Sequence, residues 1–232
     1  MKRVTSLLFV VVLVAGVLHA QETQTADEKA GGDQQVKIKG PFAETWVRPD
    51  ADISQYTKLY PWKSRFEFRK GGETRGARTT AGQLKDSGGP YVIKEESREK
   101  FEQLVNESFV KELGRSKIFE LVDEVGPDTL LVRASLLDIV SNVPPNYTGT
   151  ADVYLSAVGE ATFFFELIDA ETGEVQATVG ERQRIQPPSR MYDVSSAPAN
   201  SATIMNDIKI WATTVARGLR VALEKAQKKA SQ

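Results

Sequence analysis

The sequence predicts an α+β domain with a single, mostly antiparallel sheet and two long helices packed on it. Two apolar stripes with helical spacing, within residues 92–113 and 202–228, predict the helices. Apolar or alternating runs between them predict the strands, and two of these runs flank a short turn. Since the order is strand, helix, strands with a hairpin, and helix, we expect one sheet covered by helices.

Local patterns indicate three strands before the hairpin. Residues 56–68 carry alternating aromatic side chains, and Pro61 requires a sheet edge or a break there because it lacks a backbone N–H. After the helix at 92–113, a short strand is expected over residues 117–122. Residues 129–140 follow with Leu, Val or Ile on both faces, which predicts a central strand.

Residues 159–169 and 175–184 are expected to form a hairpin. The turn between them suits a type I turn with Gly173 in a left-handed bulge position. This turn sets a register with apolar pairs on one face and a charged pair on the other. The predicted pairs are Asp169 with Val175, Leu167 with Ala177, Phe165 with Val179, Phe164 with Gly180, Thr162 with Arg182, and Glu160 with Arg184.

The last helix has Ser201 as its expected N-cap. Its apolar stripe runs from Ile204 to Leu223, and Trp211 is the largest member. Such a stripe needs a partner surface in water, and we expect the apolar face of the hairpin to supply it. The alternative is an exposed stripe that binds another molecule. The hairpin face consists of Phe163, Phe165, Leu167, Val175 and Val179.

The first twenty residues have the layout of a secretory signal peptide. Lys2 and Arg3 precede an apolar run over residues 7–18, and small Ala20 provides the cleavage position. The alternative, a transmembrane anchor, is disfavoured because this run is too short to span a bilayer comfortably. The expected organisation is a signal peptide at 1–20, a flexible tether at 21–40 and one α+β domain at 41–229. We therefore expect a periplasmic or secreted protein without a transmembrane segment after cleavage.

The composition excludes several kinds of chemistry. The 232 residues have a formal net charge of −1, which gives no polybasic character for binding nucleic acid. The chain has no Cys and one His, which is His19 within the expected signal peptide. The processed protein would then have no Ser-His-Asp or Cys-His unit and no zinc, copper or haem site of the usual type. No catalytic, cofactor-binding or metal-binding residue is predicted.

A group of basic residues is the one candidate binding surface in the sequence. It lies among the aromatic residues of the strand at 56–68 and the Gly-rich segment that follows. It could bind an anion such as an acidic glycan, a lipid headgroup or nucleic acid. The interpretation we favour is an edge strand whose charges prevent aggregation. The six residues are Lys63, Arg65, Arg69, Lys70, Arg75 and Arg78.

Carboxylates are the remaining groups with pKa values suited to acid–base catalysis. Five of them lie on or beside the hairpin and the central strand: Asp138, Asp152, Glu160, Glu166 and Asp169. A glycosidase needs two facing carboxyl groups within roughly 5–9.5 Å. Glu160 and Glu166 are expected about 20 Å apart along one strand. We therefore expect these carboxylates to be solvated or paired with Arg, and the protein not to be an enzyme.

Five short motifs recur in an order that resembles the bacterial domain-of-unknown-function 3313 family, whose members are often labelled as envelope lipoproteins. The resemblance covers roughly residues 42–226 and implies the fold and an envelope location, but no reaction. The family often carries a lipidated Cys, which this chain lacks, and many members have Asp-Arg where this chain has Glu181-Arg182. The motifs are Gly126-Pro127-Asp128-Thr129-Leu130, Ala134-x-x-x-Asp138, Val158-Gly159-Glu160-Ala161, Asp169-x-x-Thr172-Gly173-Glu174 and Trp211-Ala212.

Two functional hypotheses follow. The first is a non-enzymatic exported envelope protein that acts as an interaction or assembly module with an envelope protein partner. The second is a periplasmic protein that binds a ligand or hydrolyses one with carboxylates. An exposed apolar patch or an open strand edge would favour the first hypothesis. A deep concave pocket lined by carboxylates would favour the second.

Overall fold

The computed structural model describes residues 35–69, 91, 93–144, 154–187, 197–198 and 200–230. All of them lie in one compact unit, which begins at Gly31. Val36 and Lys37, within the segment expected to be a tether, pair as a short strand with Val47 and Trp46. The sheet therefore includes residues that precede the expected start of the domain at residue 41. The ion pair from the Lys37 ammonium to Glu44, at 2.7 Å, adds to this pairing.

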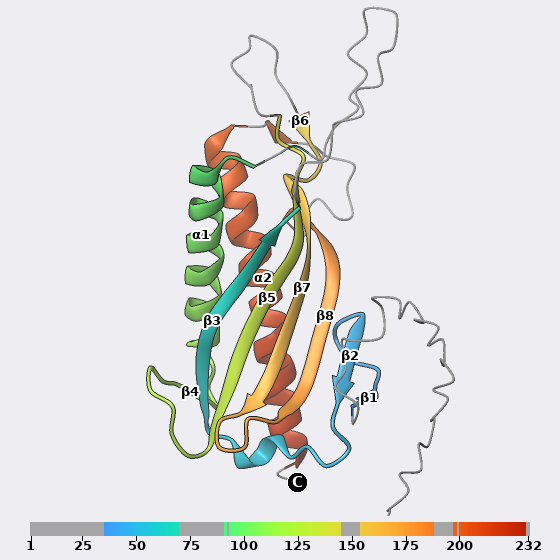
Figure 1. Ribbon diagram of the computed structural model, residues 1–232, viewed down its shortest axis with the longest axis vertical. Coiled ribbons are helices and arrows are strands. Elements are labelled where there is room, and N and C mark those ends of the chain that lie inside the picture. Colours follow the sequence, from blue (N-terminus) through green and yellow to red (C-terminus); the bar gives the residue numbers. More distant parts are fainter. Residues whose placement is uncertain are drawn as a thin grey trace, which may run out of the picture. The chain divides into compact units, whose positions relative to one another are not determined.

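A seven-stranded sheet runs through this unit in the order β1-β2-β8-β7-β5-β3-β4 (Figure 1). Its strands are β1 (Val36–Lys37), β2 (Glu44–Val47), β3 (Lys58–Phe68), β4 (Glu120–Leu121), β5 (Thr129–Ser141), β7 (Gly159–Asp169) and β8 (Val175–Ile185). A two-stranded sheet pairs β6 (Tyr154–Leu155) with β9 (Ala197–Pro198). The helices are η2 (Ile53–Gln55), α1 (Glu95–Leu113) and α2 (Ser201–Ala230). The predicted α+β class is confirmed.

The sheet is mostly antiparallel, as predicted, but it is mixed, because one strand has parallel neighbours. β3 pairs in parallel with both β5 and β4, while the other pairings are antiparallel. The reason is the position of α1, which lies between β3 and β5 in the chain. A helix that connects two neighbouring strands returns the chain to the same end of the sheet, so the strands run in the same direction.

The hairpin of β7 and β8 follows the predicted register with one exception. Five of the six predicted pairs are present, but Val175 pairs with Ile168 instead of Asp169. The register shifts after Leu167 because Gln176 is an extra residue on β8. Gly173 has φ +73°, so it occupies the predicted left-handed position.

β3 becomes an edge strand where Pro61 occurs. On one side of β3, β4 pairs only with Lys58 and Leu59 among the described residues. On the other side, β5 pairs with β3 as far as Phe68. Among the residues that the structure describes, no strand pairs with Pro61 on the outer side of β3, so its missing N–H costs no hydrogen bond there. The prediction that Pro61 requires an edge is confirmed.

The two helices lie side by side along one face of the sheet (Figure 1). α1 begins three residues later than predicted, at Glu95. α2 begins at Ser201, but Asn200 supplies the cap, because its Oδ1 accepts a 2.9 Å hydrogen bond from the backbone N–H of Thr203. Ser201 is therefore not the N-cap that the sequence indicated. Asn serves as well in this position.

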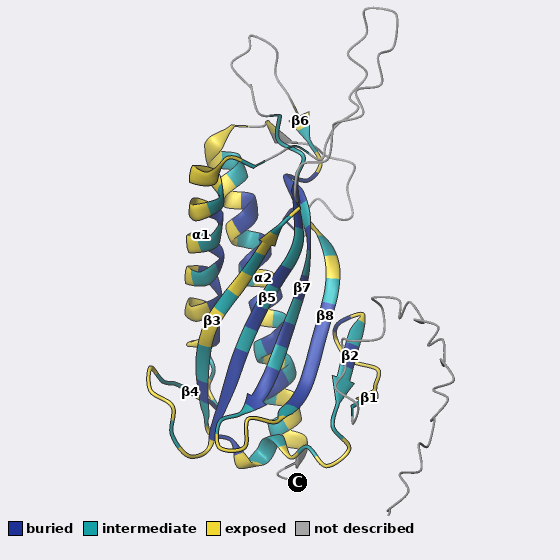
Figure 2. Ribbon diagram, in the orientation of Figure 1, coloured by how far each residue is buried: buried dark blue, intermediate teal, exposed yellow. Residues whose placement is uncertain are grey.

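The core lies between the central strands and the helices, where Figure 2 shows the buried residues gathered. Phe163 and Phe165 of β7 are buried, and Phe109 of α1 contacts the Phe165 ring with 5.4 Å between centroids. Trp211 of α2 is 2% exposed, and its indole N–H donates a 3.2 Å hydrogen bond to Oε1 of Gln183 on β8. The predicted burial of the α2 stripe is thus confirmed at its largest member.

Candidate ligand-binding site

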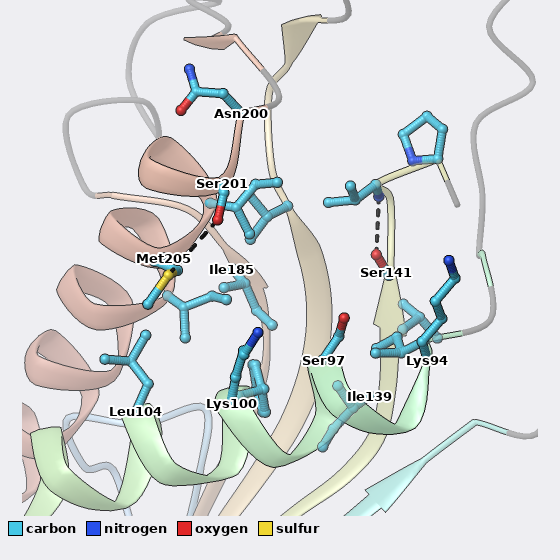
Figure 3. Close-up of a pocket in the computed structure, with 18 residues that line it drawn as sticks. Lys94, Ser97, Lys100, Leu104, Ile139, Ser141, Ile185, Asn200, Ser201 and Met205 are labelled. Carbon is cyan, nitrogen blue, oxygen red and sulfur yellow. Dashed lines mark hydrogen bonds between the residues drawn. The ribbon is translucent and has the colours of Figure 1, made fainter. Parts of the chain in front are cut away.

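A cavity of about 620 Å³ lies where the first turns of α1 and α2 meet the ends of β5 and β8 (Figure 3). Cavities of 300–1,000 Å³ are typical of small-molecule sites. Its inner wall is apolar and comes from four separate elements. Phe101 of α1, Ile139 of β5, Ile185 of β8 and Ile208 of α2 line it, and each is at most 9% exposed. The wall therefore suits a hydrocarbon group.

A bulge in β5 builds part of this wall. Ile139 and Val140 are consecutive, yet both are buried and both line the cavity, whereas neighbours in a regular strand point to opposite faces. The register with β7 shifts between Leu137 and Val140, and Asp138 at the shift has φ +52°. Such a bulge redirects side chains, and here it turns two of them toward the same cavity.

Two arginines hold Asp138 in this conformation. Arg69 donates from Nε and Nη2 to the two Asp138 carboxylate oxygens, at 2.5 Å each, and Arg182 of β8 donates from Nη1 at 2.8 Å. The hydrogen bonds from Arg69 contribute most to keeping the pKa of Asp138 below its ordinary value. The carboxylate thus ties the end of β3 and the strand β8 to the bulge.

The rim of the cavity is polar and basic. Lys94, Ser97 and Lys100 of α1 lie on one side, and Asn200 and Ser201 at the start of α2 lie on another (Figure 3). Among the described residues that line the cavity there is no acidic side chain. A lysine ammonium donates hydrogen bonds and accepts none. The rim can therefore bind a polar, electron-rich group.

The lining residues fit binding better than acid–base chemistry. Two of the described hydroxyl groups have local partners: Ser141 Oγ accepts a 3.0 Å hydrogen bond from the Val143 N–H, and Ser201 Oγ donates to the Met205 sulfur at 4.0 Å. A nucleophilic serine needs an adjacent base, and the described lining offers only Lys94 and Lys100. In the described part of the chain, no cluster of three His, Cys, Asp or Glu could hold a metal.

The three of these basic candidates that the structure describes, Lys63, Arg65 and Arg69, do not line this cavity. Arg69 binds Asp138, and Arg65 pairs with Glu67 at 3.1 Å on the exposed part of β3. Lys63 is exposed on the same strand. Lys70, Arg75 and Arg78 lie outside the described residues. The anion-binding surface stays a prediction.

The carboxylates considered for catalysis each have a structural partner where they are described. Glu166 receives two hydrogen bonds from Arg133, at 2.7 and 2.8 Å, and Glu160 pairs with Arg182 at 3.1 Å. Asp152 lies outside the described residues. These ion pairs lie on the sheet and not in the cavity.

Asp169 has a structural role in the hairpin turn. Its Oδ2 accepts a 2.6 Å hydrogen bond from the buried Tyr56 hydroxyl, and its Oδ1 accepts from the Glu171 and Thr172 N–H groups. Burial, followed by this hydrogen bond to Asp169, raises the pKa of Tyr56. The Asp-x-x-Thr-Gly motif therefore serves the turn and its attachment to the chain before β3.

Sequence reasoning did not identify Lys94, Ser97 and Lys100. Lys94 and Ser97 share helical spacing with Phe101 and Leu104, which belong to the α1 stripe. The stripe thus changes from apolar to polar at the first turn of α1. From this change, the sequence could have predicted that the first turn of α1 borders a cavity, whereas the later turns border the core.

The comparisons with known proteins concern family and fold. The family model for proteins of unknown function, DUF3313, matches residues 33–197. No curated protein matches the chain.

Several solved structures are similar to this chain at low sequence identity. XCC0632 from Xanthomonas campestris, of the DUF330 family, is 10% identical over 76% of this chain and 89% of its own, with a TM-score of 0.42. The PelC dodecamer from Paraburkholderia phytofirmans is 10% identical over 76% and 96%, with a TM-score of 0.36. A proposed lipoprotein from Caulobacter crescentus CB15 is 12% identical over 78% and 93%, with a TM-score of 0.30.

Proposed function

We propose a function for this chain, which belongs to the DUF3313 family of proteins of unknown function. In this proposal, the protein is an exported envelope protein without enzymatic activity. It binds the hydrocarbon part of an amphiphilic molecule in the cavity between α1, α2 and the sheet. The single observation that carries this proposal is the apolar cavity with its polar rim.

The energetics of burial support binding of a hydrocarbon chain. Each methylene group moved from water to an apolar site contributes about 0.8 kcal/mol. Ten such groups in the cavity would contribute roughly 8 kcal/mol before the costs of association, which are several kcal/mol. We therefore expect dissociation constants in the micromolar range or weaker for simple single-chain ligands.

Export is supported by the N-terminal sequence. Lys2 and Arg3, the apolar run at 7–18 and Ala20 have the order of a signal peptide. In the described part of the chain, no helix is both long and apolar enough to cross a membrane. The absence of enzymatic activity is supported by the ion pairs of Glu160, Glu166 and Asp138, which occupy these carboxylates structurally.

A neutral apolar probe tests the proposal. The fluorescence of N-phenyl-1-naphthylamine should rise on addition of the protein, with saturation near one probe per chain. Leu104→Trp should weaken this binding at least tenfold, because Leu104 lines the cavity and the larger side chain fills part of it. Val221→Trp, at a half-exposed position of α2, is the matched control and should bind the probe as the unmodified protein does.

Thermal unfolding of both variants shows whether each is folded. Failure of the unmodified protein to bind the probe would overturn the proposed function. Unchanged binding by folded Leu104→Trp would do the same, because the probe would then occupy another place.

A second candidate function is interaction with an envelope protein through the outer edge of β3. The observation that favours it is the short pairing of β4, which among the described residues covers only Lys58 and Leu59, beside Trp62 at 43% exposure. Such an edge can accept a strand from another chain. Affinity purification from an envelope extract should enrich one protein with the unmodified chain and not with Trp62→Glu. Equal enrichment by both would contradict this second function.

A further inference from the structure

We infer, on the basis of the proposed function, that the ligand of the cavity is a single-chain amphiphile with an anionic head. Its hydrocarbon chain lies against the apolar wall, and its phosphate, sulfate or carboxylate group lies at the rim between Lys94 and Lys100. Charge, cavity size and the layout of the rim support this assignment.

The described residues of the rim carry charge of one sign. Lys94 and Lys100 are the charged residues among the described cavity lining, while Glu95 and Glu96 stand on the first turn of α1 but do not line the cavity. Lys100 Nζ contacts Glu96 Oε1 at 2.5 Å, with the two side chains 63% and 79% exposed. An exposed pair of this kind contributes little, so the Lys100 ammonium can turn to an anion at the rim.

The polar groups of the rim come from the starts of the two helices. Lys94, Ser97 and Lys100 extend from the first turns of α1, and Asn200 and Ser201 lie at the start of α2 (Figure 3). Ammonium, hydroxyl and amide groups all donate hydrogen bonds, and an anionic oxygen accepts them. A cationic head at this position would meet two like charges. The rim therefore distinguishes anionic from cationic amphiphiles.

The size of the cavity indicates one hydrocarbon chain. A methylene group takes roughly the volume of a water molecule, about 30 Å³. A cavity of about 620 Å³ then holds on the order of 20 such groups. This is enough for one long chain together with part of its head.

A series of amphiphiles with the same chain and different heads tests the inference. Dodecyl phosphate, dodecyltrimethylammonium and dodecyl maltoside, each below its micelle concentration, compete with the neutral naphthylamine probe for the full chain. Dodecyl phosphate should displace the probe at a concentration at least tenfold lower than dodecyltrimethylammonium. Inorganic phosphate alone should not displace it, because the hydrocarbon chain supplies most of the binding.

The variant Lys94→Gln with Lys100→Gln should lose the preference for dodecyl phosphate and keep its affinity for the maltoside and the probe. The matched control is Lys111→Gln with Lys117→Gln, because both lysines are exposed near the other end of α1 and do not line the cavity. This control should keep the preference.

The outcomes separate the inference from the proposed function. Equal displacement by the three amphiphiles would overturn the anionic head while the cavity still binds hydrocarbon. A preference that persists in the Lys94 and Lys100 variant would also overturn it, because the head would then lie elsewhere. Displacement by inorganic phosphate alone would overturn the role of the chain. No binding of any amphiphile or of the probe would overturn the proposed function itself.

Discussion

Asp138 is the residue whose backbone and side chain together shape the cavity wall. Its φ of +52° is rare for a residue with a side chain, although Asp and Asn adopt it more readily than others. The bulge at this position directs both Ile139 and Val140 into the cavity. Strain of this kind persists only where the surroundings hold it, and here Arg69 and Arg182 do so.

Substitutions at Asp138 should separate the role of the backbone from that of the charge. Asp138→Asn keeps a side chain that tolerates the left-handed conformation and should lower the free energy of unfolding by about 1 kcal/mol, because the ion pairs are partly exposed. Asp138→Ala also meets the backbone penalty of about 1–2 kcal/mol and should cost more. Urea unfolding measures both values.

The binding readout of these variants is the affinity for the naphthylamine probe. Asp138→Ala should weaken it more than Asp138→Asn, because the bulge positions two cavity residues. Glu67→Ala, which removes the exposed partner of Arg65, is the control and should leave affinity unchanged. Equal losses for Ala and Asn would mean that the left-handed backbone does not shape the cavity.

Trp211 should be the most important single side chain of the α2 stripe for stability. Trp211→Ala should lower the free energy of unfolding by about 3–5 kcal/mol, since the side chain is 2% exposed and its removal leaves a large void. Trp62→Ala is the matched control and should cost less than about 1 kcal/mol, because Trp62 is 43% exposed. Denaturant unfolding of both variants gives the comparison. A loss below 1 kcal/mol for Trp211→Ala would contradict its place in the core.

At the scale of elements, a buried carboxylate joins α1 to α2. Glu112 of α1 is 1% exposed and forms ion pairs with Arg115 on its own helix and with Arg217 and Arg220 on α2. Burial raises the pKa of Glu112, but hydrogen bonds from Arg220 and Arg115 outweigh it, so the pKa is lowered overall. Such a network needs all its partners, since an isolated buried charge is costly.

The Glu112 network should make the helix pair sensitive to acid. A carboxyl group whose pKa is lower in the folded state stabilises the fold above its ordinary pKa of 4.5, and this stabilisation is lost as pH falls through the lowered value. Glu112→Gln should cost about 1–3 kcal/mol at pH 7 and progressively less at lower pH. Urea unfolding at pH 7, 5, 4 and 3 follows this change.

Glu107→Gln provides the control on the same helix, because Glu107 is exposed. It should change stability by less than about 0.5 kcal/mol at each pH. A Glu112→Gln effect that does not shrink on acidification would show that lost packing, and not lost charge, explains the destabilisation.

At the scale of the whole molecule, the layout of residues 1–20 predicts export with removal of these residues. We expect cleavage after Ala20, because the small residue follows the apolar run directly. Since the chain has no Cys, the processed protein should carry no lipid on a cysteine. Intact-mass measurement of protein recovered from the periplasm or medium tests both points. A mass that includes residues 1–20, or a lipid adduct, would contradict this prediction.

Features that depend on neighbours in the chain could be predicted from the sequence. The spacing of apolar residues identified both helices and the burial of Trp211, because a helical stripe is defined within a few turns. The turn with Gly173 set five hairpin pairs correctly. Pro61 indicated the edge portion of β3, because a missing N–H is a local property of the residue. By itself, the sequence thus determined the class of fold, the hairpin and the two helices.

Features that depend on distant segments were decided only by the tertiary structure. The parallel pairing of β3 with β5 depends on where α1 returns the chain, and the cavity forms because Lys94 and Asn200, over a hundred residues apart, lie at neighbouring helix starts. The left-handed Asp138 is held by Arg69 and Arg182 from two other strand regions. The spacing of residues along the chain does not predict these contacts, since their energies arise only when the strands and helices are packed together.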